Sequence, residues 1–377
     1  MRFNTTIRKL HLWLGISSGL LVFVIAITGC LYAFQEEILN ATQPFRFVES
    51  QNKPYLPPSK LQAIAQHELP DKLLHSIKFN VEGKAAEAIF YHYEPTYYYT
   101  IYLNPYNGDV LKVNDNEAGF FRFVLNGHFF LWLPPQIGQP LVASVTLVFV
   151  VLLITGLILW FPRELFVLKQ SVLFVWRKNT HWRRKNFDLH NVLGYYAGFF
   201  ALIIALTGLI WGFQWFANGV YKSAGGEKSL TYYDPGSRRI SSGTKSLESS
   251  PIDSIWIRIQ HEYPGAKSIE VHPPESDSSS IAANANIESD TYWKIDYRYF
   301  NQYTLEEISV NHIYGRFQEA NVADKMMRMN YDIHVGAIGG LAGKVFVFLI
   351  GLVVASLPIT GFIIWWGKRK KNKPGNK

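Results

Sequence analysis

The sequence predicts an integral membrane α-helical protein with four transmembrane helices in two tandem repeats and with two large α+β domains on its outer side. Three observations predict this fold class. Four long stretches are apolar and uncharged, lysine and arginine gather in the segments on one side of these stretches, and the same short motifs occur twice at matching positions.

Each of the four apolar stretches is long enough to cross a membrane. An α-helix rises about 1.5 Å per residue, so about 20 residues span the roughly 30 Å of hydrocarbon in a bilayer. Four buried helices of a soluble protein are the alternative, but such helices are rarely so long and so uniformly apolar. The predicted spans are residues 12–34, 141–161, 191–217 and 345–366.

The distribution of lysine and arginine predicts the orientation. The segments before the first span, between the second and third, and after the fourth hold 16 Lys and Arg against only Glu164 and Asp188, a net charge of +14. The whole chain carries +8, so the remaining segments carry −6. Because basic segments stay on the cytoplasmic side, we expect both termini inside. The basic balance then reflects membrane topology and does not indicate nucleic-acid binding.

The single cysteine, Cys30, excludes internal disulfides and covalent c-type haem, which needs Cys-x-x-Cys-His. Its context, Ile27-Thr-Gly-Cys30 after a basic start and an apolar run, resembles a lipoprotein signal. We do not expect cleavage, because the first span has a repeat partner deep in the chain, which a disposable signal peptide does not need.

The chain is interpreted as an internal duplication. The first and third spans begin with His-x-x-x-Gly and reach a Thr-Gly pair, in the order His11, Gly15, Thr28-Gly29 and His190, Gly194, Thr207-Gly208. The second and fourth spans end in Thr-Gly-x-x-x-Trp, at Thr155-Gly156 and Thr360-Gly361. Two further histidines, His128 and His334, precede these last glycines by 28 and 27 residues. Each repeat is therefore a helix, an outer domain, a short interfacial helix, a Gly- and Pro-rich break and a second helix.

Each outer domain is predicted as a helix followed by strands. In the first, Ser59 caps a helix to about Glu68, and strands lie near 76–80, 86–92, 97–103 and 110–113. In the second, Asp253 caps a helix to about Tyr263, and strands lie near 268–272, 292–299 and 307–310. The stretch 275–289, rich in Ser, Asn and Ala, is interpreted as a loop.

The predicted organisation along the chain has eight parts. They are the N-terminus with the first span (1–34), the first outer domain (35–118), an interfacial helix with the second span (119–162), a basic cytoplasmic loop (163–188), the third span (189–217), the second outer domain (218–319), an interfacial helix with the fourth span (320–366) and a basic tail (367–377).

The first outer domain, with its turn Asn104-Pro-Tyr-Asn-Gly108-Asp109, resembles a PepSY domain. Together with the motifs His190-Asn-Val-Leu-Gly and Thr-Gly-x-x-x-Trp, it makes nearly the whole chain similar to the PepSY-associated transmembrane (PepSY-TM) family. The resemblance implies a haem-containing reductase of ferric siderophores or other ferric chelates in the cell inner membrane, with two periplasmic PepSY-like domains. Some relatives carry a fused flavin reductase that this sequence lacks, so we expect a separate, unidentified electron donor.

Four of the 11 histidines, His11, His190, His128 and His334, occupy matched positions of the duplication. The topology places His11 and His190 at the inner ends of their spans and His128 and His334 at the outer entrances. Each face thus receives one pair, the arrangement of two bis-histidine b-type haems, since haem iron accepts a neutral imidazole nitrogen from each side. A single boundary histidine is usually an interface residue, but four in register are not readily explained that way.

Other candidates are weaker. A pair of histidines without carboxylates is a poor zinc or iron site. His181 competes as an inner ligand but has no counterpart in the other repeat. Arg8 and Arg183 inside, and Arg122 and Arg328 outside, are candidates to hold haem propionates, although boundary arginines also reach to lipid headgroups.

Two other classes of function stay open. PepSY domains also occur as inhibitory modules of protease propeptides, which suggests a membrane-anchored regulatory or adaptor protein that modulates a peptidase without redox activity. Repeats and broken helices also mark transporters, but no charged residue lies within the four predicted spans, and the repeats have parallel topology.

Overall fold

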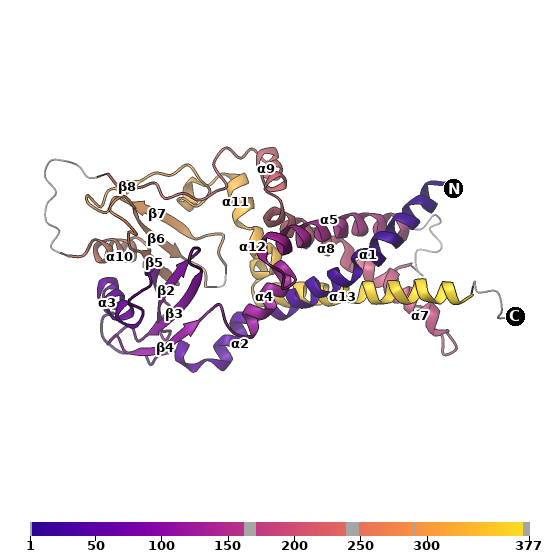
Figure 1. The fold of residues 1–377 in the computed structure, drawn as a ribbon, viewed down its shortest axis with the longest axis horizontal. Coiled ribbons are helices and arrows are strands. Elements are labelled where there is room, and N and C mark those ends of the chain that lie inside the picture. Colours follow the sequence, from indigo (N-terminus) through magenta and orange to yellow (C-terminus); the bar gives the residue numbers. More distant parts are fainter. Residues whose placement is uncertain (1, 162–170, 239–248, 290, 372–377) are drawn as a thin grey trace. The chain divides into compact units, whose positions relative to one another are not determined.

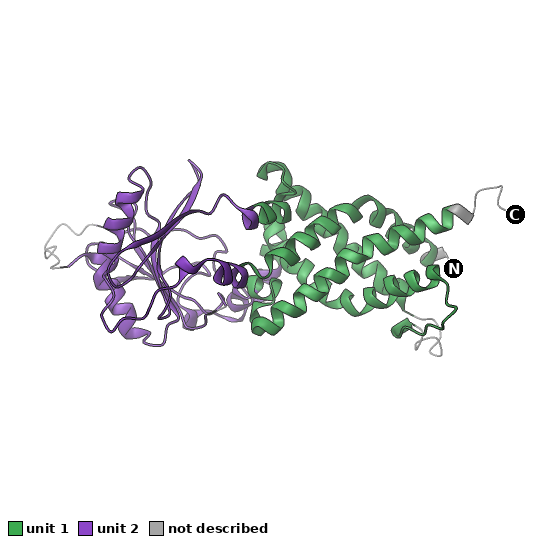
Figure 2. Cartoon of the chain, turned by 90° about the horizontal axis from the view of Figure 1, so that it is seen from below, with its two compact units in different colours: residues 1–35, 123–219, 330–377 green, residues 36–122, 220–329 purple. Residues whose placement is uncertain are grey.

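The computed structural model describes residues 2–161, 171–238, 249–289 and 291–371. The chain divides into two compact units, shown in different colours in Figure 2. Unit 1 contains residues 1–35, 123–219 and 330–377, and unit 2 contains residues 36–122 and 220–329. Four of the basic residues that predict the topology, Arg163, Lys169, Lys373 and Lys377, lie outside the described residues.

Unit 1 is built on four long helices (Figure 1): α1 (Arg2–Tyr32), α5 (Pro135–Trp160), α8 (Gly194–Gly212) and α13 (Gly340–Lys371). All four predicted spans are confirmed as helices long and apolar enough to cross a membrane, so the chain is a membrane protein. The second begins earlier than predicted. Pro135 stands in its first turn, where the missing N–H costs nothing, and Pro140 is accommodated inside the helix.

The core of unit 1 depends on small side chains along α8. Ala197, Ala201 and Ala205 are buried one turn apart, and they pack in one cluster with Val145 and Leu153 of α5. Small residues let helix backbones approach closely, which is how helices associate where lipid removes the hydrophobic driving force. The outward side chains are large and apolar, as expected of helices that face lipid.

Short elements connect these helices. They are α2 (Gln35–Thr42), η1 (Pro44–Arg46), α4 (Phe120–Phe130), α7 (Trp182–Asp188), η3 (Leu189–Leu193), α9 (Gln214–Ser223), η4 (Phe317–Glu319), α11 (Val322–Arg328), α12 (Asn330–His334) and η5 (Ala337–Gly339). After α4 the backbone turns through left-handed Leu131 and Trp132, and the matching turn before α13 uses Gly336 and Gly340, also at positive φ. Non-glycine residues rarely adopt this conformation, and Trp132 is held in it by an Nε1–H bond to the Phe123 carbonyl of 2.8 Å.

Unit 2 is one antiparallel sheet of eight strands with the order β4-β3-β2-β1-β5-β6-β7-β8. The strands are β1 (Ser76–Asn80), β2 (Ala86–His92), β3 (Tyr97–Leu103), β4 (Val110–Asp115), β5 (Ser268–His272), β6 (Ile281–Asn286), β7 (Asp296–Phe300) and β8 (Glu307–Ile308). Two helices, α3 (Pro58–Glu68) and α10 (Pro251–Glu262), pack against it.

The two segments that the sequence predicts as separate outer domains are joined in this single unit. Strand β1 of the first segment pairs with β5 of the second, with Ile77 opposite Val271 and Phe79 opposite Ile269. A four-stranded sheet with one helix leaves an open strand edge, and pairing the two edges satisfies the backbone groups of both. The pairing also merges the two helix-covered faces into one core.

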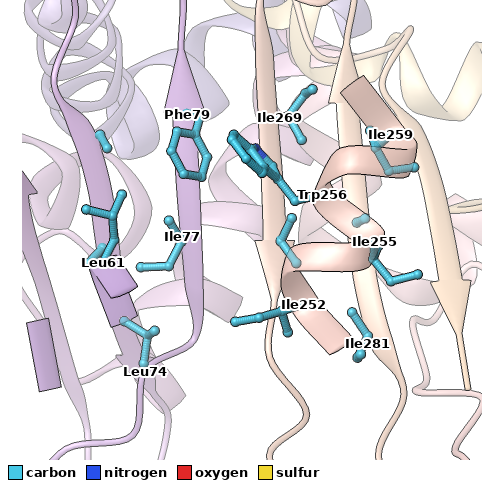
Figure 3. Packing of buried hydrophobic residues seen from close by; sticks show 14 of the residues in the cluster. Leu61, Leu74, Ile77, Phe79, Ile252, Ile255, Trp256, Ile259, Ile269 and Ile281 are labelled. Carbon is cyan, nitrogen blue, oxygen red and sulfur yellow. The ribbon is translucent and has the colours of Figure 1, made fainter. Parts of the chain in front are cut away.

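Figure 3 shows that core. Trp256, Ile255 and Ile259 of α10 lie over the sheet, and the Trp256 ring meets Phe79 of β1 with centroids 4.8 Å apart. The two helices also bind each other, because Asp253 of α10 accepts from the Ser59 backbone N–H at 2.8 Å and from its hydroxyl. Ser59 and Asp253 are therefore not the N-caps that the sequence predicts. Pro57 and Ser250 occupy those positions.

The strands of the first segment are confirmed, whereas the second departs from the prediction. The predicted loop 275–289 contains β6, whose inward residues Ile281, Ala283 and Ala285 are fully buried. In the sequence, β6 is marked only by an alternation of inward and outward residues, and two of its three inward residues are alanines. Alanine has low strand propensity, but its small size suits a strand that lies directly beneath α10.

A buried ion network at the end of the sheet gives a test of unit 2. The Arg298 guanidinium is fully buried and binds Glu307 and Glu262, while Arg316 also donates to Glu307 at 2.6 Å. Burial alone would raise the pKa of Glu307, but hydrogen bonds from Arg316 and Arg298 outweigh it and lower the pKa to about 2.

We predict that Glu307→Gln lowers the free energy of unfolding of unit 2 by about 3 kcal/mol, the lower end for a broken buried pair, since Glu262 still binds Arg298. The exposed neighbour Glu306, changed to Gln, is the matched control. A carboxyl with a lowered pKa stabilises the fold above its ordinary pKa of 4.5 and stops doing so as pH falls toward 2. Thermal unfolding in detergent should thus show that the Glu307→Gln protein is less stable than the wild type at neutral pH and that this difference in stability shrinks in acid. A difference that does not depend on pH would contradict the lowered pKa of Glu307.

Candidate cofactor site: two histidine pairs

The structure brings the four matched histidines together as two pairs, both within unit 1. His11 of α1 lies beside His190 of η3, with ring centroids 6.4 Å apart and ring planes at 83°. His128 of α4 lies beside His334 of α12, with centroids 6.2 Å apart and planes at 63°. These are the two pairings that the duplication predicts.

Each of these imidazoles is held by a threonine from another helix. The Nδ1 atom of His11 lies 2.9 Å from Thr155 Oγ1, and that of His190 lies 2.9 Å from Thr360 Oγ1. The Nδ1 atom of His334 lies 2.9 Å from Thr207 Oγ1, and that of His128 lies 3.4 Å from Thr28 Oγ1. The four threonines are those of the repeated Thr-Gly motifs.

A backbone carbonyl completes each contact. His128 Nδ1 lies 2.8 Å from the Ile25 carbonyl, and His334 Nδ1 lies 3.1 Å from that of Ile204. The carbonyls of Leu152 and Leu357 have the same role for His11 and His190. In all four cases the carbonyl belongs to the residue three before the threonine, so one helical turn supplies both acceptors.

These contacts determine which nitrogen carries the proton. Thr155 and Thr360 donate their single hydroxyl hydrogen to carbonyls of their own helices, which leaves Oγ1 as an acceptor. Thr28 and Thr207 do the same. A carbonyl accepts only, so Nδ1 must be the N–H of each ring. The free lone pair is then on Nε2. In metal-binding histidines, a hydrogen bond from one ring nitrogen likewise leaves the other nitrogen free to bind the metal.

The glycine after each threonine makes room for the ring. A Cβ on Gly29 would stand 2.9 Å from His128 Cε1, and one on Gly156 would stand 3.2 Å from His11 Cε1. The corresponding distances are 3.2 Å for Gly361 and His190, and 3.5 Å for Gly208 and His334. We call the carbonyl, threonine and glycine together a Thr–Gly socket. The described residues form four sockets, one for each of the four paired histidines.

Two of the four sockets also include an asparagine. Asn186 and Asn330 each stand four residues before a paired histidine, and both are buried. Asn186 Nδ2 donates to the Thr360 carbonyl at 3.0 Å, and Asn330 Nδ2 donates to the Thr207 carbonyl at 3.1 Å. His190 itself lies in η3, a π-helical turn between α7 and α8. Such turns are rare and occur often at functional sites.

The two pairs lie near opposite ends of the same helices. Helix α1 carries His11 and, 17 residues later, Thr28, which holds His128. At about 1.5 Å per residue this separation is about 26 Å, close to the hydrocarbon thickness of a bilayer. His190 and Thr207 have the same spacing in the second repeat.

The other candidates have different roles. His181 is exposed and caps α7, where its Nδ1 accepts from the Arg183 N–H at 3.2 Å. Arg8 and Arg183 are exposed residues of unit 1. Arg122 and Arg328 belong to unit 2, in which Arg122 pairs with Glu117, and buried Arg328 stacks on Tyr297 and Phe317. The predicted propionate contacts of these four arginines stay predictions.

The four matched histidines are not the only ones that meet, because the rings of His75 and His272 in unit 2 lie 4.8 Å apart, centroid to centroid. In the part of the chain that the structure describes, no group of three His, Cys, Asp or Glu side chains is placed to hold a metal ion. Of the remaining histidines, His312 is fully buried among Tyr232, Tyr233 and Tyr299 and serves as a packing residue. Each of the two matched pairs offers two imidazole nitrogens to a metal, and any further ligands would come from water or from a bound cofactor.

The threonines and glycines of the sockets are the site residues that sequence reasoning missed. Their repetition is visible in the sequence, where it indicates a duplication but not a contact with the histidines. The signal that identifies them is numerical: four Thr-Gly pairs and four matched histidines occur in one chain. A one-to-one match between two motifs suggests that their members touch.

The comparisons with known proteins agree with the architecture. The family model of the PepSY-associated TM region matches residues 8–368. A search of curated proteins finds no match.

We predict that Gly29→Ala destabilises unit 1 by about 1–3 kcal/mol, because the new methyl group lies too close to His128 Cε1 and must displace the ring or α4. The control is Gly219→Ala in α9, where a Cβ meets nothing within 4 Å. That change should stabilise the helix by about 0.5–1 kcal/mol. Thermal unfolding in detergent measures both, and equal effects of the two substitutions would show that the glycine at position 29 makes no room for His128.

Proposed function

We propose, from the premise that the chain belongs to the family of PepSY-associated TM regions, that it is a haem protein that carries electrons across the cell inner membrane to a ferric siderophore. The observation that carries the proposal is the pair of imidazoles at each of two sites, with Nδ1 bound to a Thr–Gly socket and ring centroids 6.4 and 6.2 Å apart.

The spacing of the rings suits one metal ion between two imidazoles. A nitrogen–metal bond is about 2 Å long and the nitrogen lies about 1 Å from its ring centroid, so two rings on opposite sides of one ion have centroids about 6 Å apart. Both pairs have this separation. Two nitrogens make a poor site for a bare metal ion, whereas a haem would bring its own porphyrin nitrogens to the iron and would need only the two imidazoles from the protein.

The residues fit b-type haem in particular. His11 and His190 would hold one haem and His128 and His334 the other, each through Nε2. Covalent attachment is excluded because Cys30 is the only cysteine. Arg8 and Arg183, which lie in unit 1 like the histidines, are the proposed propionate partners of the haem at the His11–His190 pair. Haem supplies one-electron redox chemistry, and the protein supplies the ligand geometry and a site surrounded by apolar helices.

The proposed direction is from the cytoplasm outward. The basic segments support this direction, because the positive-inside rule favours a cytoplasmic position for both termini and for the His11–His190 pair. Unit 2, with its PepSY-like segments, would then lie in the periplasm and offer the surface for a chelate. Reduction of Fe(III) to Fe(II) weakens its bonds to hard oxygen ligands, so the siderophore releases the iron. The +14 charge of the inner segments suits brief docking of an acidic electron donor.

We predict that the protein purified from haem-replete cells contains about two low-spin haem b groups per chain, which acid acetone extracts. His11→Ala or His190→Ala should remove or convert one haem, and His128→Ala or His334→Ala the other. His181→Ala is the matched control and should leave both, because His181 only caps α7. Visible spectra and extracted haem measure the outcome. A protein without a Soret band would remove the redox proposal and favour the regulatory alternative.

We predict that reconstituted protein, once chemically reduced in vesicles, is reoxidised by a membrane-impermeant ferric chelate added on the side of unit 2. The reason is that unit 2, which is built on an eight-stranded sheet, offers a folded surface large enough to bind a chelate. Orientation is assigned by protease accessibility of the C-terminal tail. Reoxidation only from the side of the basic segments, or by no ferric chelate tested, would contradict the reductase assignment.

A further inference from the structure

We infer, on the basis of the haem function proposed above, that the Thr–Gly sockets hold the two imidazole planes of each pair at a large angle to each other. The socket threonines are then positioning residues, because the angle between the two rings affects the electronic state of the haem iron. The planes are at 83° for His11 and His190 and at 63° for His128 and His334. Neither pair is close to parallel.

The socket fixes the plane because it holds the ring by more than one atom. An imidazole that donates to a single acceptor still rotates about the Cβ–Cγ bond. Here Nδ1–H points between two acceptors on one helical turn, such as the Ile204 carbonyl and Thr207 Oγ1 for His334. The following glycine lies against Cε1 of the same ring. These three contacts restrict the rotation of each imidazole about its Cβ–Cγ bond.

Ring orientation matters because each imidazole acts on one iron d orbital, the one perpendicular to its plane. Two parallel rings act on the same d orbital, so its energy differs from that of the d orbital at right angles to it. Two crossed rings act on both orbitals and keep them nearly equal in energy. Low-spin ferric iron then retains a large orbital moment, which appears in the electron paramagnetic resonance spectrum as one strongly anisotropic low-field signal. Parallel rings give the ordinary three-line rhombic spectrum.

The two pairs should differ in how anisotropic their electron paramagnetic resonance signals are. The His11–His190 planes are closer to perpendicular than the His128–His334 planes. Thr155 and Thr360 hold the first pair at 2.9 Å each, whereas the Thr28 contact to His128 is 3.4 Å. The His11–His190 site should therefore give the more anisotropic of two distinguishable signals.

The test is low-temperature electron paramagnetic resonance of the oxidised full-length protein, together with a redox titration. The wild type should show two strongly anisotropic signals and no rhombic one. Thr155→Val removes one of the two acceptors of His11 but keeps the side-chain shape. It should shift only the more anisotropic signal, and it should raise the midpoint potential of that haem, since an imidazole with a weaker Nδ1–H bond donates less to ferric iron.

Two controls separate positioning from general disturbance of the helix. Thr155→Ser keeps the hydroxyl and should restore the wild-type signal and potential. Thr146→Val changes another threonine of α5, whose hydroxyl bonds the Val142 carbonyl, and should alter neither. Thr207→Val should shift only the second signal, because Thr207 holds His334.

Three results would overturn the inference. A rhombic wild-type spectrum with normal haem content would show parallel rings and refute the crossed geometry, while the haem proposal would stand. Unchanged signals and potential in Thr155→Val would refute the role of the socket. Absence of bound haem would refute both this inference and the proposed function.

Discussion

The N–H group of an imidazole inside a bundle of apolar helices needs an acceptor, and the four Thr–Gly sockets meet this need. An unsatisfied polar hydrogen in such surroundings costs several kcal/mol, so each histidine determines which helix turn it packs against. His11 joins α1 to α5, His190 joins the third span to α13, His128 joins α4 to α1, and His334 joins α12 to α8. The packing of the bundle and the geometry of the histidine pairs thus follow from the same contacts, and the small residues of α8 and of the sockets allow the required close approach.

The two halves of the chain contribute to both units. In unit 1 each half supplies one member of each histidine pair, so a pair forms only when both halves are present. In unit 2 each half supplies four strands and one helix that packs on them, and β1 and β5 join the halves in one sheet. A half with a single helix over four strands buries little apolar surface, whereas the combined core unites Leu61, Ile77 and Phe79 with Trp256 and Ile281. Both units therefore depend on contacts between residues that are far apart in sequence.

The features that the sequence predicts are those with a local or periodic signal. The four spans, the strands of the first outer segment and the matching of His11 with His190 and of His128 with His334 all follow from composition, alternation or repetition. The joined sheet was not predicted because nothing local marks β1 and β5 as partners. Strand β6 was missed because alanines at its inward positions suggest a loop. The sockets were missed because each contact crosses at least 100 residues, as between Thr28 and His128, so only the folded chain shows that a threonine and a histidine meet.

The central claim is that Nε2 of each paired histidine is the nitrogen that binds haem iron, because Nδ1–H is committed to the socket. The most direct test is an experimental structure of the haem-loaded protein at a resolution that defines ring orientation. We expect one porphyrin between His11 and His190 and a second between His128 and His334, with Nε2 toward each iron and Nδ1 on Thr155, Thr360, Thr28 and Thr207. Haem bound elsewhere, for example through His181, or ligation through Nδ1 with the sockets empty, would contradict the account.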